Sequence, residues 1–425
     1  MVKIKFVQRL LLVTGLAYGF TAQADDSQKL AQWLQGRVDA HPEVRAAEAG
    51  LQAAQARLRA AGKALFNPQL DLEVEEGEVK TSQIGLSQEI DWGDQRGSRS
   101  RVAEHRQQAA SLAYRQTRHE VAARLLTALA EWDSAQSIQQ LAQQRLELMS
   151  RFAELARLRQ QAGDLSQVEA DLATLALSEA RFQAAIAASQ QAASEQTLLA
   201  LTGGERNFPA LLKQLPVLQL QEAELDALLQ QLPAVQAARA QLAAARAGVE
   251  LARSEASANP TLGLRGGKEG DVSLIAFNLS IPLQLRNNFQ AEVDAANAEY
   301  LSARSEADNV YRQADSRLRT ALRAYQLSLA AWQSWLQTGE RSLSTQISLL
   351  QRLWQTGELS TTDYLVQLKQ ALDTQAVAYE QRSMMWRDWA EWLRASGRIQ
   401  QWLQTPGSQS TENTNNGETA VAGEE

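Results

Sequence analysis

Thr356-Gly357-Glu358-Leu359-Ser360-Thr361-Thr362-Asp363 repeats, in residue type and spacing, the earlier stretch Ala162-Gly163-Asp164-Leu165-Ser166-Gln167-Val168-Glu169. In each copy the glycine supplies the positive φ that ends one helix. The Ser-x-x-Asp/Glu that follows is a capping box, which begins the next helix. Because long amphipathic segments flank both copies, each predicts the tip of a long antiparallel helical hairpin, at 162–166 and at 356–360.

The two hairpins belong to an internal duplication of the chain. Pro42-Glu43-Val44 is echoed by Pro233-Ala234-Val235, and Asn67-Pro68 by Asn259-Pro260. The offset drifts only from 191 (233 − 42) to 194 (357 − 163). We therefore predict a first repeat over 25–203, a connector over 204–232, a second repeat over 233–397 and a disordered acidic tail over 398–425.

Within each repeat the hydrophobic period changes once from helical to strand-like. Leu70, Leu72 and Val74 alternate with acidic residues, and Ile84 and Leu86 alternate with polar or small residues after a turn. Alternation with period two on both sides of a turn is typical of a β-hairpin. This pattern predicts hairpins at 69–91 and, in the second repeat, at 261–283.

The long helices carry apolar residues at coiled-coil spacing, with periods of three and four. After the first tip the predicted seam consists of Leu165, Val168, Leu172, Leu175, Phe182 and Ile186, and after the second tip of Leu365, Leu368, Leu372, Tyr379, Trp386, Trp389 and Leu393.

The N-terminus predicts export of the protein, and the composition excludes several classes of protein. Lys3, Lys5 and Arg9 precede an apolar run and Ala22-Gln23-Ala24, which predicts a signal peptide over 1–24. The absence of cysteine excludes disulfides and thiolate metal sites. Removing three cations changes the formal charge from −7 to −10 (−7 − 3), which disfavours nucleic-acid binding. No catalytic motif is recognisable, so we do not expect an enzyme.

The apolar faces of the predicted strands need a cover, and no second sheet is evident in the sequence. A lipid bilayer could cover them, but open sheet edges are not tolerated in lipid. Known barrels begin at about eight strands, so the four strands of one chain are too few. The expected fold is mainly α with a small β part, in which three chains supply twelve strands.

The duplicated order of helix, hairpin, long helix, Gly-x-Leu-Ser tip and return helix resembles the TolC family of outer-membrane efflux channels over about residues 30–400. The segment from Leu86 to Arg96 is similar to the heavy-metal, CzcC-like branch. The resemblance implies a homotrimer with a twelve-stranded transmembrane β-barrel and an α-helical tunnel across the periplasm. It implies a passive exit duct for heavy-metal cations. Its partners would be a periplasmic adaptor (membrane fusion protein) and an inner-membrane pump of the resistance-nodulation-division type.

Several residues take roles that this resemblance implies. Asp363 matches the acid that lines the periplasmic aperture of the family, and Glu169 is its counterpart in the first repeat; both also suit helix capping. The tips would contact the adaptor through Gly163, Asp164, Leu165, Gly357, Glu358 and Leu359, although the two glycines also serve as ordinary helix terminators.

The remaining aromatic and histidine residues have simpler interpretations. Trp92, at the end of the first hairpin, is expected at the edge of the bilayer. Trp386, Trp389 and Trp392 are expected to pack in the helical wall. His105 and His119 lie fourteen residues apart (119 − 105), about 21 Å along a helix, so they cannot share a metal ion within one chain. We expect neither a metal site nor a cofactor.

Two alternatives remain open. One is a soluble periplasmic coiled-coil adaptor or scaffold, which should lack two equivalent β-hairpins. The other is the same type of channel serving drug efflux or type I secretion, since the sequence does not determine the cargo.

Overall fold

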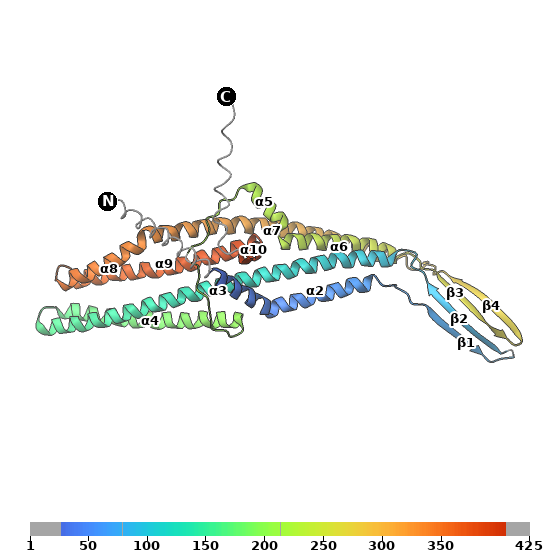
Figure 1. Ribbon diagram of the computed structural model, residues 1–425, viewed down its shortest axis with the longest axis horizontal. Coiled ribbons are helices and arrows are strands. Elements are labelled where there is room, and N and C mark those ends of the chain that lie inside the picture. Colours follow the sequence, from blue (N-terminus) through green and yellow to red (C-terminus); the bar gives the residue numbers. More distant parts are fainter. Residues whose placement is uncertain (1–26, 79, 213, 405–425) are drawn as a thin grey trace, which may run out of the picture. The chain divides into compact units, whose positions relative to one another are not determined.

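Two long helical hairpins and a four-stranded sheet make up the fold (Figure 1), which we describe from a computed structural model. The described residues are 27–78, 80–212 and 214–404, so the signal peptide predicted for 1–24 lies outside them. The chain divides into two compact units. Unit 1 comprises Met1–Val44, Arg118–Leu228 and Ser316–Glu425, and unit 2 comprises Arg45–Thr117 and Leu229–Asp315.

Residues 27–40 are helical, and the elements labelled in Figure 1 follow them. In chain order they are α2 (Pro42–Ala61), β1 (Gln69–Glu75), β2 (Thr81–Glu89), α3 (Gln95–Ala162), α4 (Gln167–Thr202), α5 (Glu222–Gln231), α6 (Pro233–Glu255), β3 (Thr261–Glu269), β4 (Val272–Ser280), α7 (Gln290–Ser334), η1 (Trp335–Gly339), α8 (Glu340–Gln355), α9 (Thr361–Ala395) and α10 (Ile399–Gln404).

The sheet of unit 2 joins the two hairpins in the antiparallel order β1-β2-β3-β4. The hairpins meet where β2 pairs with β3, from Thr81 opposite Glu269 to Glu89 opposite Thr261. The predicted mainly α fold with four strands is therefore confirmed. Strands β1 and β4 each have one edge that pairs with no other described strand.

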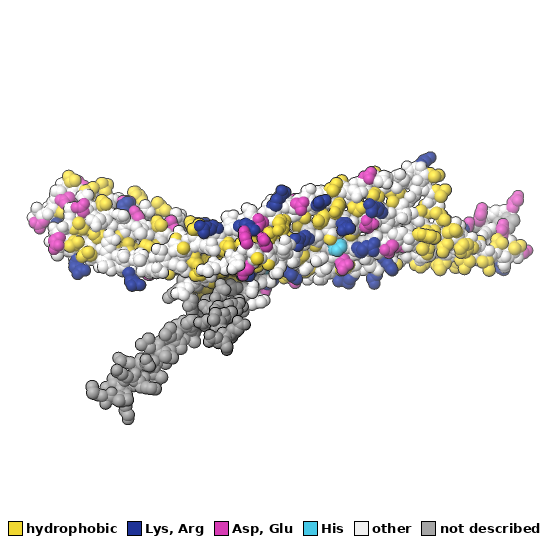
Figure 2. Space-filling model, turned by 90° about the horizontal axis from the view of Figure 1, so that it is seen from above, with side chains coloured by type: hydrophobic (Ala, Val, Ile, Leu, Met, Phe, Trp, Pro, Cys, Tyr) yellow, Lys and Arg dark blue, Asp and Glu magenta, His cyan; other side chains and the backbone are white. Residues whose placement is uncertain are grey.

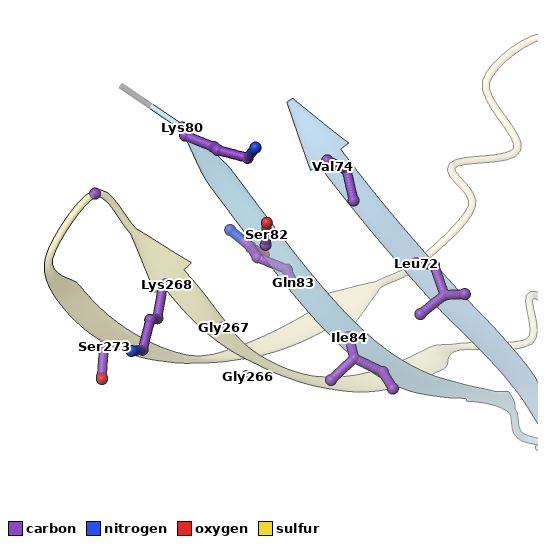
Figure 3. A pocket seen from close by; sticks show the side chains of 11 residues that line it. Leu72, Val74, Lys80, Ser82, Gln83, Ile84, Gly266, Gly267, Lys268 and Ser273 are labelled. Atoms are coloured by element: carbon purple, nitrogen blue, oxygen red, sulfur yellow. The ribbon is translucent and has the colours of Figure 1, made fainter. Parts of the chain in front are cut away.

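One face of this sheet is apolar and exposed. The register aligns Leu70 with Leu86, Leu86 with Leu264, and Leu264 with Phe277. Their exposed fractions lie between 56% and 70%. Figure 3 shows Leu72, Val74 and Ile84 on the adjacent strands β1 and β2, where they line a hollow of about 770 Å³.

The other face of the sheet carries polar and charged side chains. Ser87 donates a hydrogen bond of 2.9 Å to Asp71, and Arg265 lies 3.4 Å from Glu73. Glycine leaves room for the Arg265 side chain here, because a Cβ on Gly85 would lie 2.7 Å from that side chain. The alternation read from the sequence thus separates the two faces.

In unit 1 the α3–α4 hairpin buries a face that we did not predict. Helix α3 runs for 68 residues, and α4 returns for 36. The buried residues of α4 include Ala173, Ala180 and Ala187, seven apart, whereas Val168 and Phe182 are 69% and 70% exposed. The seam predicted for α4 is therefore wrong within the protomer. Alanine is buried instead because small side chains let helices approach closely.

The second hairpin differs from the first by a π-helical turn, η1, between α7 and α8. The N–H of Glu340 donates to the carbonyl oxygen of Trp335, five residues earlier. The turn needs glycine at Gly339, since a Cβ there would lie 2.2 Å from the Trp335 ring. The corresponding stretch of the first repeat belongs to the uninterrupted helix α3.

Tryptophans on α9 form the deepest packing of unit 1, as predicted. Trp386, Trp389 and Trp392 are at most 1% exposed, and the Trp389 ring lies 4.9 Å from the ring of Tyr325 on α7. The Tyr325 hydroxyl donates a hydrogen bond of 2.5 Å to the Pro216 carbonyl in the connector. The connector thereby packs on the second repeat.

The structure corrects the predicted boundary of the tail. A disordered tail from 398 is wrong for its first residues, because Ile399 and Trp402 on α10 are buried and Trp402 contacts Trp389 edge-on; residues 405–425 of that tail lie outside the described residues. Residues 27–40, before Pro42, form a helix whose residues Leu30, Leu34 and Val38 are buried at four-residue spacing.

Within residues 27–404, apart from 79 and 213, no helix is long and apolar enough to cross a membrane.

Candidate functional site at the hairpin tips

Both tips end their first helix with the same backbone motif. Gly163 and Gly357 have φ of 86° and 81°. The N–H of each glycine donates to the carbonyl three residues earlier, and the next N–H donates to the carbonyl five residues earlier, over 2.9 Å in both tips. This is the Schellman motif, which satisfies the last carbonyls of a helix. The Gly-acid-Leu-Ser sequence thus fixes the turn.

The helices that leave the tips are capped differently. At the first tip the Ser166 hydroxyl accepts from the Glu169 N–H, and a Glu169 carboxylate oxygen accepts from the Ser166 N–H over 3.1 Å. At the second tip Ser360 caps the Asp363 N–H, while its hydroxyl donates to Asp363 over 2.7 Å. Aspartate is one methylene shorter than glutamate. The first capping box is therefore reciprocal, and the second is carried by the serine hydroxyl.

The two tips, both in unit 1, contact each other. The Arg159 guanidinium of α3 donates to the Gln355 carbonyl over 3.2 Å and lies 4.9 Å from the centre of the Trp354 ring. Glu169 accepts a hydrogen bond from Thr361, the first residue of α9. The first repeat is thus joined to the second at the turns.

An aromatic cluster lies beneath the tips. Phe152 of α3 contacts Trp354 of α8 and Tyr364 of α9, with ring centres 4.6 Å and 5.3 Å apart. All three side chains are buried, and Leu165 and Leu359 of the tips pack against the same cluster. Such aromatic pairs contribute about 0.5–1.5 kcal/mol beyond burial. The predicted tip residues therefore divide into two inward leucines and the exposed Gly163, Asp164, Gly357 and Glu358.

Farther from the tips, four charged side chains join three helices. Arg145 of α3 lies 3.0 Å from Asp373 of α9 and 3.7 Å from Glu179 of α4. Lys369 of α9 pairs with Glu179 and lies 3.9 Å from Asp373. Sequence reasoning missed this network. Its one local signal is the Lys369–Asp373 spacing, because Glu179 lies 34 residues from Arg145 (179 − 145) and the other pairs are 190 and 228 residues apart.

The two aperture candidates lie at the starts of their helices but in different surroundings. Asp363 is exposed on α9, whereas Glu169 is half-buried between Ser166 and Thr361. Hydrogen bonds from the side chain and backbone of Ser166, with a further one from Thr361, lower the pKa of Glu169 from its usual 4.5. Glu169 therefore has a structural role at the tip, while Asp363 leaves its carboxylate open to solvent.

An apolar stripe on α4 begins next to the first tip and faces outward. It consists of Val168, Leu172, Leu175, Phe182 and Ile186, all exposed. On α9, Val366 and Val377 are each 60% exposed. We call the α4 residues the outer stripe.

The segment from Leu86 to Arg96 forms the turn from β2 into α3. Asp91 accepts hydrogen bonds from the N–H groups of Gln95 and Arg96 over 2.7 Å and 2.9 Å, which caps α3. A Cβ on Gly93 would lie 2.7 Å from the Ser254 carbonyl oxygen. Trp92 is 77% exposed beside this turn. The local geometry accounts for Asp91 as the cap of α3 and for glycine at position 93.

The part of the chain that the structure describes holds no cluster of three or more His, Asp or Glu residues able to bind a metal ion. His41 instead lies at the start of α2, where its Nδ1 accepts from the Glu43 N–H over 3.3 Å.

We expect the first tip to lose stability in acid through Glu169. Because its pKa is lowered in the folded state, the carboxylate stabilises the tip above the ordinary glutamate range, and this stabilisation disappears as pH falls through the lowered value. Glu169→Gln should therefore lower the Tm at about pH 7, and the difference from wild type should shrink at about pH 3.

Glu358→Gln, which removes an exposed carboxylate at the other tip, is the matched control. A Tm difference for Glu169→Gln that is equal at both pH values would contradict this role.

Comparisons with known proteins agree with this architecture. Residues 33–204, the first repeat, match the outer membrane efflux protein family. The outer-membrane channel OprN is 17% identical over 88% of this chain and 91% of its own, with a TM-score of 0.73. VceC of Vibrio cholerae is 17% identical over 87% and 96%, with a TM-score of 0.71, and CusC is 15% identical over 87% and 92%, also at 0.71.

No curated protein sequence matches this chain. The first repeat thus matches the outer membrane efflux protein family in sequence, and the chain has the fold of TolC-type outer-membrane channels.

Proposed function

We propose that this protein is the outer-membrane channel of a tripartite efflux system, a passive duct built from three copies of the chain. The observation that carries the proposal is the sheet of unit 2. It exposes an apolar face and leaves one edge of β1 and one edge of β4 unpaired. Pairing β4 of one copy with β1 of the next would remove both edges, and lipid would cover the apolar face.

The outer stripe on α4 supports the same assembly. Isolated surface hydrophobics are ordinary, but a row at coiled-coil spacing that ends at a tip is an interaction surface. A second copy is the occupant that fits, because Val366 and Val377 on α9 offer an exposed apolar surface of the same kind. The alanine seam packs α4 inside the protomer and leaves the outer stripe for the neighbouring copy.

The alternative of a soluble periplasmic adaptor or scaffold does not account for the sheet. Such a protein would expose ten apolar side chains on one face of the sheet to water, more than isolated surface residues explain. They are Leu70, Leu72, Val74, Ile84, Leu86, Leu262, Leu264, Ile275, Phe277 and Leu279.

We propose heavy-metal cations as the cargo, selected by the partner pump. The support is the similarity of residues 86–96 to the heavy-metal branch, and the chain's own part would be conduction and electrostatics. Loss of resistance to heavy-metal salts on deletion of the channel would support this cargo. Unchanged metal resistance with increased drug sensitivity would instead favour drug efflux.

We expect Phe277→Arg to prevent assembly in the outer membrane. Phe277 lies in the middle of β4 on the apolar face, where arginine in lipid costs about 2–4 kcal/mol. Asn278→Arg is the matched control, because the neighbouring side chain points to the polar face. Membrane fractionation and native mass spectrometry of the detergent-extracted protein measure the result. Equal recovery of both variants as trimers would refute the lipid-facing assignment.

We expect Asp363→Asn to weaken cation block of the channel in planar bilayers. In a trimer this exposed carboxylate recurs three times around one axis, which attracts cations. The loss should be about fivefold or more, since a charge within about 4 Å of a cation contributes about 1 kcal/mol even in water. Glu340→Gln, on α8 away from the tip, is the control. An unchanged response of Asp363→Asn rules out the entrance assignment.

We propose that the exposed tips contact a periplasmic adaptor, which joins the duct to an inner-membrane pump. Because the chain has no cysteine, single cysteines at Asp164 and Glu358 can carry a crosslinker without background. We expect both to capture the adaptor, and a cysteine at Lys80, beside a strand turn, to capture none. Capture from Lys80 alone would overturn the docking role.

A further inference from the structure

The backbone groups on the free edges of β1 and β4 follow a fixed phase. The N–H of Ile90 donates to the Pro260 carbonyl over 2.8 Å, at one end of the β2–β3 pairing. The N–H of Gly270 donates to the Lys80 carbonyl over 2.9 Å, at the other end. Even-numbered residues of β2 therefore bond β3, and its odd-numbered residues bond β1. Counted through the registers, the outward N–H and C=O groups belong to even-numbered residues of β1 and odd-numbered residues of β4.

The residues with outward backbone groups also carry the apolar side chains. On β1 they are Leu70, Leu72 and Val74, and on β4 they include Phe277 and Leu279. Figure 2 shows hydrophobic side chains, in yellow, gathered over the strands at the right of the view. A joint that pairs the free backbone groups of two copies therefore also keeps the apolar side chains on one face. Registers that meet both conditions differ by steps of two residues.

The apolar alternation of β4 continues beyond its last residue, Ser280. Ile281 and Leu283 are 54% and 77% exposed, and residues 281–289 lie in no helix or strand of the described chain. Pro282 has no N–H, and its position in the alternation faces β3, which accounts for the end of the β3–β4 pairing. The proline therefore ends the pairing inside the protomer but removes no donor from the free edge.

Closure of a barrel by three equal copies displaces the strands along one another, and the displacement sets their tilt. The four strands of one copy are about 19 Å wide, and each residue advances about 3.3 Å along a strand. Displacements of two, four and six residues per copy then tilt the strands by about 19°, 35° and 46°. Because barrel strands tilt by about 35–45°, the displacement is four or six residues.

The ends of the strands determine the direction of this displacement. Without displacement, Leu70 of the next copy would lie opposite Phe277, the last member of its row in the sheet. Four residues toward the strand turns would place Leu70 opposite Ser273, the second residue of β4, so that most of β1 would have no partner. Displacement toward the helices instead places Leu70 opposite Ile281 or Leu283.

We propose that β4 continues beyond Ser280 in the assembled barrel and that Ile281 and Pro282 pair with β1 of the next copy. The inference rests on the proposed function, because the neighbouring copy supplies the partner strand. The exposed apolar segment after β4 is thus part of the joint between copies, and the strand reaches its full length only in the assembly.

A displacement of four residues fits the chain better than one of six. The N–H of Leu285 donates to the Leu283 carbonyl over 2.9 Å, so the extended segment ends in a tight turn there. Six residues would require the Leu283 carbonyl for the joint, whereas four require the chain only as far as Pro282. We therefore expect Asp71 of the next copy to lie opposite Ser280.

Disulfide crosslinking tests this joint, because the chain has no cysteine of its own. Toward the next copy Asp71 is in a non-hydrogen-bonded pair, where Cα atoms lie about 4.5 Å apart, within disulfide range. Oxidation of Asp71→Cys/Ser280→Cys in outer membranes should give covalent trimers on a non-reducing gel. The matched control Asp71→Cys/Ala276→Cys reports the undisplaced register; its cysteines would lie about 13 Å apart and form none. Asp71→Cys/Pro282→Cys reports a displacement of six.

Covalent trimers from the Ser280 or the Pro282 pair support the proposal and give the displacement. Crosslinking of the Ala276 pair, or of none of the three in variants that native mass spectrometry shows to be trimeric, would overturn it. Hydrogen exchange of the wild-type trimer is independent of the cysteines: the Ile281 amide should be protected, and free exchange would also overturn the joint. Wild-type protein without trimers or conductance counts against the channel itself, whereas conducting trimers without these contacts reject only the joint.

Discussion

The rest of the structure depends on the unpaired edges of β1 and β4. A strand edge is a row of backbone donors and acceptors, and each one left unpaired away from water costs free energy comparable to a lost hydrogen bond. The sheet pairs internally wherever four strands allow it, through β1–β2, β2–β3 and β3–β4. The register aligns apolar side chains on one face of the sheet, so the unpaired backbone groups beside that face would not bond water once lipid covers it. In the proposed assembly, pairing with other copies of the chain satisfies the backbone groups of both edges, and lipid covers the apolar side chains.

The two repeats differ in helix geometry although their sequences share one pattern. The α3–α4 hairpin contains an uninterrupted 68-residue helix, whereas the second hairpin contains a π turn beside Gly339. The tips are nevertheless joined by Arg159, the aromatic cluster and the network around Arg145. Charge differs as well, since cations at the start of α3 correspond to acids at the start of α7.

The glutamate–aspartate difference at the tips illustrates how one methylene separates two roles. The Glu169 carboxylate accepts a hydrogen bond from the Ser166 N–H and thereby caps the helix. The Asp363 carboxylate accepts a hydrogen bond from the Ser360 hydroxyl and stays exposed. Aspartate at this position leaves its carboxylate exposed to solvent. Glutamate at the same position uses its carboxylate to bond the backbone N–H of the N-cap serine. The sequence motif is the same in both, and the side-chain length decides which group remains available.

The sequence by itself determined the tips, the strands and the duplication. Gly163, Ser166 and their counterparts act on their own backbone, and alternation such as Leu70-Asp71-Leu72 sets the two faces of a strand locally. Only the tertiary structure decided which face of α4 is buried. Val168, Leu175 and Phe182 have the same seven-residue spacing as Ala173, Ala180 and Ala187, so period could not choose between them. The close approach of the helices selected alanine. The contact of Arg145 with Asp373 was equally invisible, because these residues are distant in the chain and meet only when both hairpins pack.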